Sequence, residues 1–350
     1  APIHRWSVLP GKQTITLPQQ MLVIEAFSGL ETELGTLRVD LAGKRKADVS
    51  IPLTRFHSAA EGGYSAGNTH LHLMKISREA ADRYLEEIPP ADGLDVLFLS
   101  YLERAGADQE YISNRYTDGD LASLTRRSTT LFGNGEEHRH NFEGYGEGYG
   151  HVMLLNIAKL IQPVSIGPGI MKRGTDGMPL QRGIDTARGD GATVVWCHNE
   201  SGRELISNLF TGRIDAQNIF DGSIRSSYKE SFYRYLNAGL KVPFSTGTDW
   251  FLYDFSRVYA ALDEAPTVTN WLHSLAAGNT YITNGPLLSF RVDGEPIGAT
   301  LDLDRARTVR IVARVEGRAD FGRIELVQNG ETIHSLPTSP VGAPVAATIP

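Results

Sequence analysis

The sequence has little that would support a disulfide framework, a membrane span or a nucleic-acid interface. Its 350 residues include one cysteine, Cys197, which excludes an internal disulfide and a thiolate-rich zinc site. No apolar run is long enough to cross a bilayer as a helix. The formal net charge is -7, with no basic stripe and no block of like charge. We therefore expect a small-molecule substrate as partner, and neither nucleic acid nor membrane.

The rest of the composition is that of a globular protein. Hydrophobic residues make up 41% and charged residues 21% of the chain, which is enough for a sizeable core. The sequence begins Ala-Pro-Ile-His-Arg-Trp, without an initiator Met. An exported, mature form and a trimmed chain are both compatible with that beginning.

Three regions differ in their pattern of apolar residues. Residues 1–63 contain short β-like runs, and residues 64–285 alternate apolar strands with helical periodicity. Residues 286–350 return to β-like alternation and finish in a Pro/Ala-rich tail. We expect an α/β barrel domain over 64–285, flanked by N- and C-terminal β segments, with a weakly ordered tail.

Individual elements follow from the same patterns. Strands are predicted at 13–17, 21–27, 37–41, 47–53, 95–102, 191–199, 242–250, 287–294 and 308–315, and helices at 77–88, 226–240 and 268–279. Asn329-Gly330 predicts a hairpin turn. The run 151–161 is apolar nearly throughout and does not distinguish strand from helix.

Two histidines and two strand ends indicate a metal site. His70 and His72 are two residues apart, a spacing that on a strand directs both rings to one face. His198 and Asp249 each follow a strand-like run. In a parallel barrel these side chains would converge on one mouth, and nitrogen and oxygen ligands without thiolate suit Zn, Mn or Fe. Taken by itself, the His70–His72 pair is equally explained as exposed or hydrogen-bonded histidines, and a lone His198 or Asp249 at a strand end is more often a helix cap or a hydrogen-bond partner.

Residues 135–151 are rich in histidine, glutamate and glycine. The glycines of 144–150 lack the dinucleotide-binding spacing, and no Gly-Lys-Ser/Thr motif is present, so a phosphate cradle is not expected. Cys197 precedes His198 directly, and neighbours on a strand point to opposite faces. The thiol is therefore expected to be structural, and nucleophilic catalysis is not expected.

The order of several motifs resembles the PHP superfamily (polymerase and histidinol phosphatase). The motifs are Thr-His-Leu-His-Leu at 69–73, Gly-Glu-Glu at 135–137 followed by Gly-Tyr-Gly-His at 148–151, Val-Val-Trp-Cys-His-Asn at 194–199 and Ser-Thr-Gly-Thr-Asp-Trp at 245–250. The sequence from 276 to 294 is similar to the CehA/McbA branch, the carbaryl-hydrolase-like metallohydrolases. Covering about residues 64 to 300, the resemblance implies a distorted seven-stranded (β/α) barrel of TIM-like form with metals at the strand C-termini.

The resemblance also implies a ligand set. One metal would be bound by His70, His72, Glu137 and Asp249, and a second by Glu137, His151 and His198, with Glu137 bridging the two. Many relatives hold a third metal through histidines that are here replaced by Arg78, Leu102 and Phe251. At most two metals are therefore expected. Asn68 replaces an Asp that often precedes the opening pair, which puts one supporting contact in question.

These features predict a metal-dependent hydrolase with a binuclear site, in which a metal-bridging hydroxide cleaves an ester, amide or carbamate. A PHP phosphoesterase and a non-catalytic, metal-stabilised module binding a carbohydrate or a partner protein are the alternatives. Arg78, His138 and His140 are expected to assist catalysis, and Arg115, Arg139, Asn199 and Trp250 to contact substrate. For residues 138–140 a lid over the substrate and a solvated loop are both open.

Overall fold

The computed structural model describes residues 6–9, 11–104, 111–113, 116–140, 148–163, 177–199, 202–221, 229–318, 321–338 and 345–349. The strands are β1 Met21–Ala26, β2 Gly35–Asp40, β3 Tyr64–Leu73, β4 Val96–Arg104, β5 Tyr111–Ser113, β6 Leu131–Arg139, β7 His151–Leu155, β8 Thr193–Trp196, β9 Ala216–Asn218, β10 Phe244–Ser245, β11 Asp249–Trp250, β12 Arg257–Ala261, β13 Thr280–Thr283, β14 Leu287–Val292, β15 Ile311–Glu316, β16 Arg323–Gln328, β17 Glu331–Pro337 and β18 Val345–Ile349. The helices are α1 Arg78–Ala91, α2 Asp118–Arg127, α3 Leu180–Gly189, α4 Leu205–Phe210, α5 Lys229–Asn237 and α6 Val268–Ala277.

The central element is a large mixed sheet that curves into a nearly closed barrel. Its strands follow the order β10-β9-β8-β7-β6-β4-β3-β12-β13, with β11 added to β3 and β5 to β4. The two outermost strands, β10 and β13, lie close to each other. Thr280 Oγ1 of β13 donates a hydrogen bond to the Phe244 carbonyl of β10 at 3.2 Å. The predicted α/β barrel is confirmed, although the sheet is mixed: β7, β12 and β13 run antiparallel to their neighbours.

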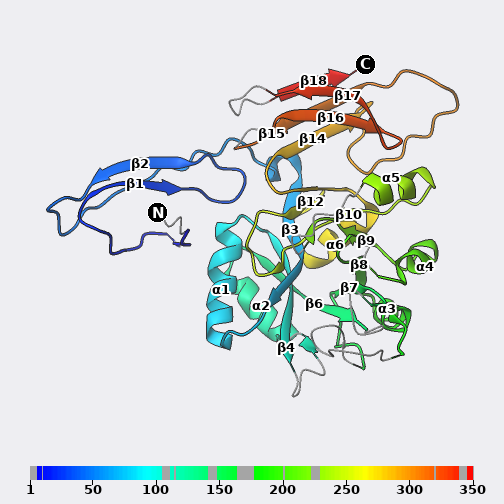
Figure 1. Ribbon diagram of the computed structural model, residues 1–350, viewed down its shortest axis with the longest axis horizontal. Coiled ribbons are helices and arrows are strands. Elements are labelled where there is room, and N and C mark those ends of the chain that lie inside the picture. Colours follow the sequence, from blue (N-terminus) through cyan, green and yellow to red (C-terminus); the bar gives the residue numbers. More distant parts are fainter. Residues whose placement is uncertain are drawn as a thin grey trace.

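Helices cover the outside of this sheet. Figure 1 shows α1 and α2 on one flank of the barrel and α3, α4 and α5 on the other. The predicted helix 77–88 corresponds to α1, and Ser77 is its N-cap as predicted. The Ser77 side chain accepts a hydrogen bond from Ala80 N at 3.1 Å. Inside the sheet, Trp271 of α6 lies 5.7 Å from Phe98 of β4, ring centre to ring centre, and fills the barrel interior.

Smaller sheets flank the barrel at both ends of the chain. Strands β1 and β2 form an antiparallel pair that extends away from the barrel, whereas β14 to β18 lie together beyond its upper edge in Figure 1. The predicted Asn329-Gly330 hairpin is confirmed, with both residues at positive φ between β16 and β17.

Three expectations about local structure were wrong. Residues 13–17 and 47–53 form no strands, because neither run finds a neighbouring strand with which to share backbone hydrogen bonds. The tail is not simply weakly ordered, since β18 pairs antiparallel with β15. The ambiguous run at 151–161 is a strand over its first five residues.

Among the described residues, no helix is long and apolar enough to cross a membrane.

Candidate metal centre

The carboxyl ends of the parallel strands meet at one edge of the barrel, and the predicted ligands lie there. His70 and His72 are near the end of β3, and Glu137 is near the end of β6. His151 opens β7, which runs antiparallel and therefore starts at the same edge, opposite Arg139. His198 follows β8 by two residues.

Asp249 reaches the same edge because its segment runs alongside β3. Thr248 N donates to the His70 carbonyl and Phe251 N to the His72 carbonyl, each at 3.0 Å. This pairing places Asp249 between the two histidines, with its Oδ1 3.4 Å from the Nε2 atom of each. The two Nε2 atoms are 3.0 Å apart, as the alternation of side chains along a strand predicts.

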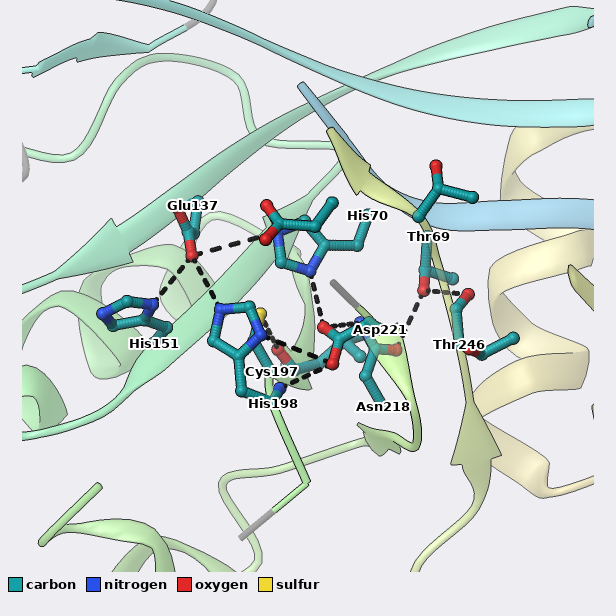
Figure 2. Close-up of polar contacts among 12 residues, drawn as sticks. Thr69, His70, Glu137, His151, Cys197, His198, Asn218, Asp221 and Thr246 are labelled. Carbon is teal, nitrogen blue, oxygen red and sulfur yellow. Dashed lines mark hydrogen bonds and ion pairs between the residues drawn. The ribbon is translucent and has the colours of Figure 1, made fainter. Parts of the chain in front are cut away.

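Glu137 lies at the middle of the group. Its Oε1 is 2.9 Å from His151 Nδ1, 3.4 Å from His198 Nε2 and 3.8 Å from His70 Nε2. Its Oε2 is 3.3 Å from His72 Nε2. Figure 2 shows the carboxylate between His151, His198 and His70. One carboxylate is therefore shared by imidazoles from three strand ends.

The spacing of these atoms fits metal coordination. Ligands about 2.1 Å from a tetrahedral ion lie ~3.4 Å from one another, and that is the distance from Asp249 Oδ1 to both histidines. Three triads of the described residues have ligand atoms within 4.8 Å of one another: His70 with Glu137 and His198, His70 with His72 and Asp249, and His70 with Cys197 and Asp221. Glu137 Oε1 is also buried without a hydrogen bond from any described residue. A buried carboxylate oxygen of this kind needs a cation or a proton.

Electrostatics keep the carboxylate of Glu137 charged. Burial alone would raise the pKa of Glu137, but Arg139 and His151 outweigh it and hold the pKa well below its usual range. Burial likewise opposes charge on His70, yet Asp249 and Asp221 raise its pKa. The pocket is thus strongly negative apart from its histidines and Arg139, which suits a divalent cation that displaces the histidine protons.

Asp221, which the sequence analysis did not single out, joins the two halves of the group. Its Oδ2 is 2.7 Å from His70 Nδ1, and its Oδ1 accepts from the His198 backbone N at 2.9 Å. Asn218 Nδ2 donates to Asp221 at 3.1 Å. Asp221 lies three residues beyond β9, so its position after a strand end was the one signal that could have revealed it. A carboxylate on the far nitrogen of a ligating histidine fixes the ring and its tautomer.

Backbone strain is concentrated at this edge. His198, Asn199, Asp249 and Phe251 all have positive φ, between 49° and 61°. Such conformations are uncommon for residues with a side chain and persist where the surrounding structure enforces them. They allow the chain to turn sharply after β8 and around β11, so that the side chains point into the barrel mouth.

His138 lies on the face of β6 opposite Glu137, and His140 follows the strand directly; residues 138–140 form neither of the two alternatives considered for them, a lid or a solvated loop. Both rings are fully buried, and His138 Nδ1 is 2.8 Å from Glu136 Oε1. A methyl group on Gly183 of α3 would lie 2.2 Å from His138 Nε2, so the ring packs directly on that helix. Because side chains alternate along a strand, Glu137 faces the candidate metal centre, whereas Glu136 and His138 face the other side of β6. No catalytic role for His138 or His140 follows from this placement.

Three of the four residues predicted to contact substrate lie in the part of the chain that the structure describes. Arg139 faces the centre, with Nη1 3.4 Å from Glu137 Oε2. Trp250 lies at the rim, 38% exposed, with its ring 5.3 Å from that of His72. Asn199 is buried, and its Oδ1 accepts from Phe220 N at 2.8 Å, so it supports a neighbouring loop. Arg115 lies outside the described residues.

Arg78 and Phe251 stand at two of the positions where the sequence predicts that histidine ligands of a third metal are replaced. Both side chains make other contacts. Arg78 Nε is 2.9 Å from Asp82, its Nη2 is 3.0 Å from Asp120, and its guanidinium lies over the Tyr116 ring. Phe251 packs edge to face on Tyr84. The side chain of Leu102 lies outside the described part of the structure.

Two residues with nucleophilic side chains, Cys197 and Ser65, have structural surroundings. Cys197 is buried in an apolar cluster with Met153 and Val195, and burial raises the pKa of its thiol well above the usual range. Residues 63–67 read Gly-Tyr-Ser-Ala-Gly, the spacing of a serine-hydrolase elbow. Ser65, however, lies inside β3 and not at a turn between a strand and a helix, so it does not present its hydroxyl as that motif requires.

Comparison with known proteins gives a structural likeness and no sequence match. No family model matches the chain, and no curated protein matches it. Among solved structures, it is similar to a two-domain protein from Bacteroides vulgatus ATCC 8482 described as containing a predicted PHP-like metal-dependent phosphoesterase. The identity is 12%, the match covers 82% of this chain and 86% of that one, and the TM-score is 0.47.

Proposed function

We propose that this chain is a metal-dependent hydrolase that binds two divalent ions, Zn, Mn or Fe, through His70, His72, Glu137, His151, His198 and Asp249. The observation that supports this most directly is the position of Glu137, whose buried carboxylate is approached by imidazoles on both sides. A carboxylate in that position can bridge two ions. The motifs at 69–73, 135–151, 194–199 and 245–250 make the PHP superfamily, and within it the CehA/McbA branch, the proposed relationship.

Bound metal ions would supply an activated water near neutral pH and a positive field for the charge that develops on the scissile group. The chain's own residues have separate tasks. Asp221 holds His70 with its Nε2 toward Glu137 and Asp249. Arg139 presents a cation next to Glu137, where it can attract the oxygen of a carbonyl or phosphoryl group. Trp250 offers an aromatic surface at the rim for the rest of a small-molecule substrate.

The bond proposed to be cleaved is an ester, amide or carbamate. Arg139 is placed to act on a single developing negative charge, as in attack on a carbonyl. Arg78 is held by Asp82 and Asp120, and Phe251 packs on Tyr84, so these positions give no further clamp for a phosphoryl group. A phosphoesterase remains the second candidate, since the same arginine can bind a phosphate oxygen. For either reaction we propose residues 64–285 as the catalytic domain.

Parallel assays on one preparation test the proposal. The chain is stripped with chelator, loaded separately with Zn or Mn, and assayed on p-nitrophenyl acetate, a naphthyl carbamate and p-nitrophenyl phosphate. We expect turnover of the first two that depends on added metal and disappears in Glu137→Ala. Preferred turnover of the phosphate would favour the phosphoesterase. Metal binding without turnover of any of the three would favour a metal-stabilised binding module, and absence of metal binding would overturn the proposal.

A further inference from the structure

A second cavity lies away from the barrel mouth, between residues 56–64 and the sheet formed by β14 and β15. Its volume is about 360 Å³, and none of its lining residues belongs to the metal centre. That volume is in the range of small-molecule sites, which often form where two parts of a fold meet.

Several polar side chains of this cavity come from one face of the β14–β15 pair. Ser289 is directly opposite Arg314 and Leu287 is directly opposite Glu316, so these side chains share a face. Arg291 is two residues beyond Ser289 and lies on that face as well. Two guanidinium groups and a hydroxyl therefore border one space.

Three ion-paired side chains line one side of the cavity: Glu316 is buried, His57 is partly buried and Arg314 is exposed. Glu316 Oε2 is 2.7 Å from His57 Nδ1, and Arg314 Nη2 is 2.5 Å from Glu316 Oε1. Glu316 is only 8% exposed, and these partners hold its pKa below the usual range although burial opposes this. This side of the cavity is therefore fixed in position and its carboxylate is already neutralised. Arg291, whose Nη1 donates to the Gly294 carbonyl at 2.8 Å, adds a positive charge at the other end of the cavity.

The wall formed by residues 56–64 supplies different chemistry. Phe56 and Tyr64 contribute aromatic surface, and Ser58 contributes a hydroxyl. Glu61, also in the lining, disfavours a second anionic group at its end of the space. A ligand that matches this lining has one carboxylate, several hydroxyl groups and a flat apolar face.

We propose that this cavity binds an acidic monosaccharide of the uronic acid type, with its carboxylate at Arg291. Guanidinium groups bind carboxylates through paired, charge-assisted hydrogen bonds, and sugar rings stack their apolar faces on aromatic side chains. The site would hold a sugar ligand next to the barrel without using the metal centre. It therefore stands independently of the proposed hydrolase activity.

Calorimetric titration of the full chain with sodium glucuronate and with glucose tests this inference. Chelator is present throughout, so that the sugar cannot report on the metal centre. We expect glucuronate to bind at least about tenfold more tightly than glucose, because only the acid makes the charge-assisted contact. Arg291→Gln should weaken glucuronate binding about tenfold while leaving the glucose affinity within about twofold.

Arg310→Gln is the matched control, because it removes the same charge from an exposed position just before β15 that does not line the cavity. It should leave both affinities within about twofold. Ser289→Ala gives a second, milder change inside the cavity and should weaken glucuronate several-fold. Equal affinity for both sugars, equal losses in Arg291→Gln and Arg310→Gln, or no binding of glucuronate would each overturn the inference.

Discussion

Asp221 connects the two histidines that stand on either side of Glu137: one oxygen is 2.7 Å from the His70 ring, and the other accepts from the His198 backbone. All three residues are almost completely buried. The carboxylate pKa is strongly lowered: burial opposes the charge, but His198 and His70 outweigh it. Asp221 therefore remains an anion that holds the ring of His70, one of the proposed metal ligands.

Removing that charge should weaken metal binding without unfolding the chain. We expect Asp221→Asn to lower the affinity for Zn or Mn by about tenfold or more, because the His70 ring loses its charged partner. Competition with a chromophoric chelator measures the affinity. Asp263→Asn, at an exposed position, is the control and should match the wild type. Equal affinities for all three proteins would contradict the orienting role.

Glu136 and Glu137 are neighbours that face opposite sides of β6, so their variants should separate metal binding from stability. Glu137→Gln should lose most bound metal, as measured by elemental analysis. Glu136→Gln should keep the metal content and lower the free energy of unfolding by about 2 kcal/mol, because the buried hydrogen bond between its side chain and the His138 ring is weakened. Metal loss in Glu136→Gln with retention in Glu137→Gln would reverse the assignment of faces.

Gly247 touches the backbone of His70 and should tolerate no side chain. An alanine Cβ there would lie 2.5 Å from His70 Cβ and 2.7 Å from His70 N and O. We expect Gly247→Ala to destabilise the fold by about 1–3 kcal/mol through overpacking and to reduce metal content, since His70 must move. Gly189→Ala, where nothing lies within 4 Å, is the control and should be close to neutral in thermal unfolding.

Metal removal should destabilise the whole chain. An ion present at 100 times its dissociation constant stabilises the folded state by about 2.7 kcal/mol, so chelation should lower Tm by a few degrees. Scanning calorimetry with and without chelator measures the difference, and added Zn or Mn should restore it. In Glu137→Gln the chelator should have little further effect; an unchanged response in that variant would place the stabilising ion elsewhere.

Acid should remove the contribution of Glu316 to stability. Its pKa is lower in the folded chain than its ordinary value of 4.5, because His57 and Arg314 outweigh the opposing effect of burial. The contribution is therefore complete above about pH 5 and is lost as the pH falls through the folded pKa. The difference in Tm between wild type and Glu316→Gln, measured in chelator, should shrink below pH 4.5. A Tm difference that grows as the pH falls would contradict the predicted loss of the Glu316 contribution in acid.

Much of the centre was predictable because its residues sit on local patterns. The two-residue spacing of His70 and His72 puts both rings on one face of any strand, and His198 and Asp249 follow apolar runs. The same alternation places Glu137 and His138 on opposite faces, but a glycine-rich context concealed that β6 continues to Arg139. Neither the lid nor the solvated loop considered for residues 138–140 is found for this reason.

The sequence by itself determined the type of many elements, the pairing of His70 and His72 on one strand and the absence of a thiolate-rich site, because these depend on neighbours in the chain and on a single cysteine. Only the tertiary structure decided which carboxylate supports His70. Asp221 is 151 residues from His70 and carries no local motif, and the two meet because the sheet brings the ends of β3 and β9 to one edge. The placement of β18 on β15 likewise depends on a partner strand that the tail's composition does not reveal.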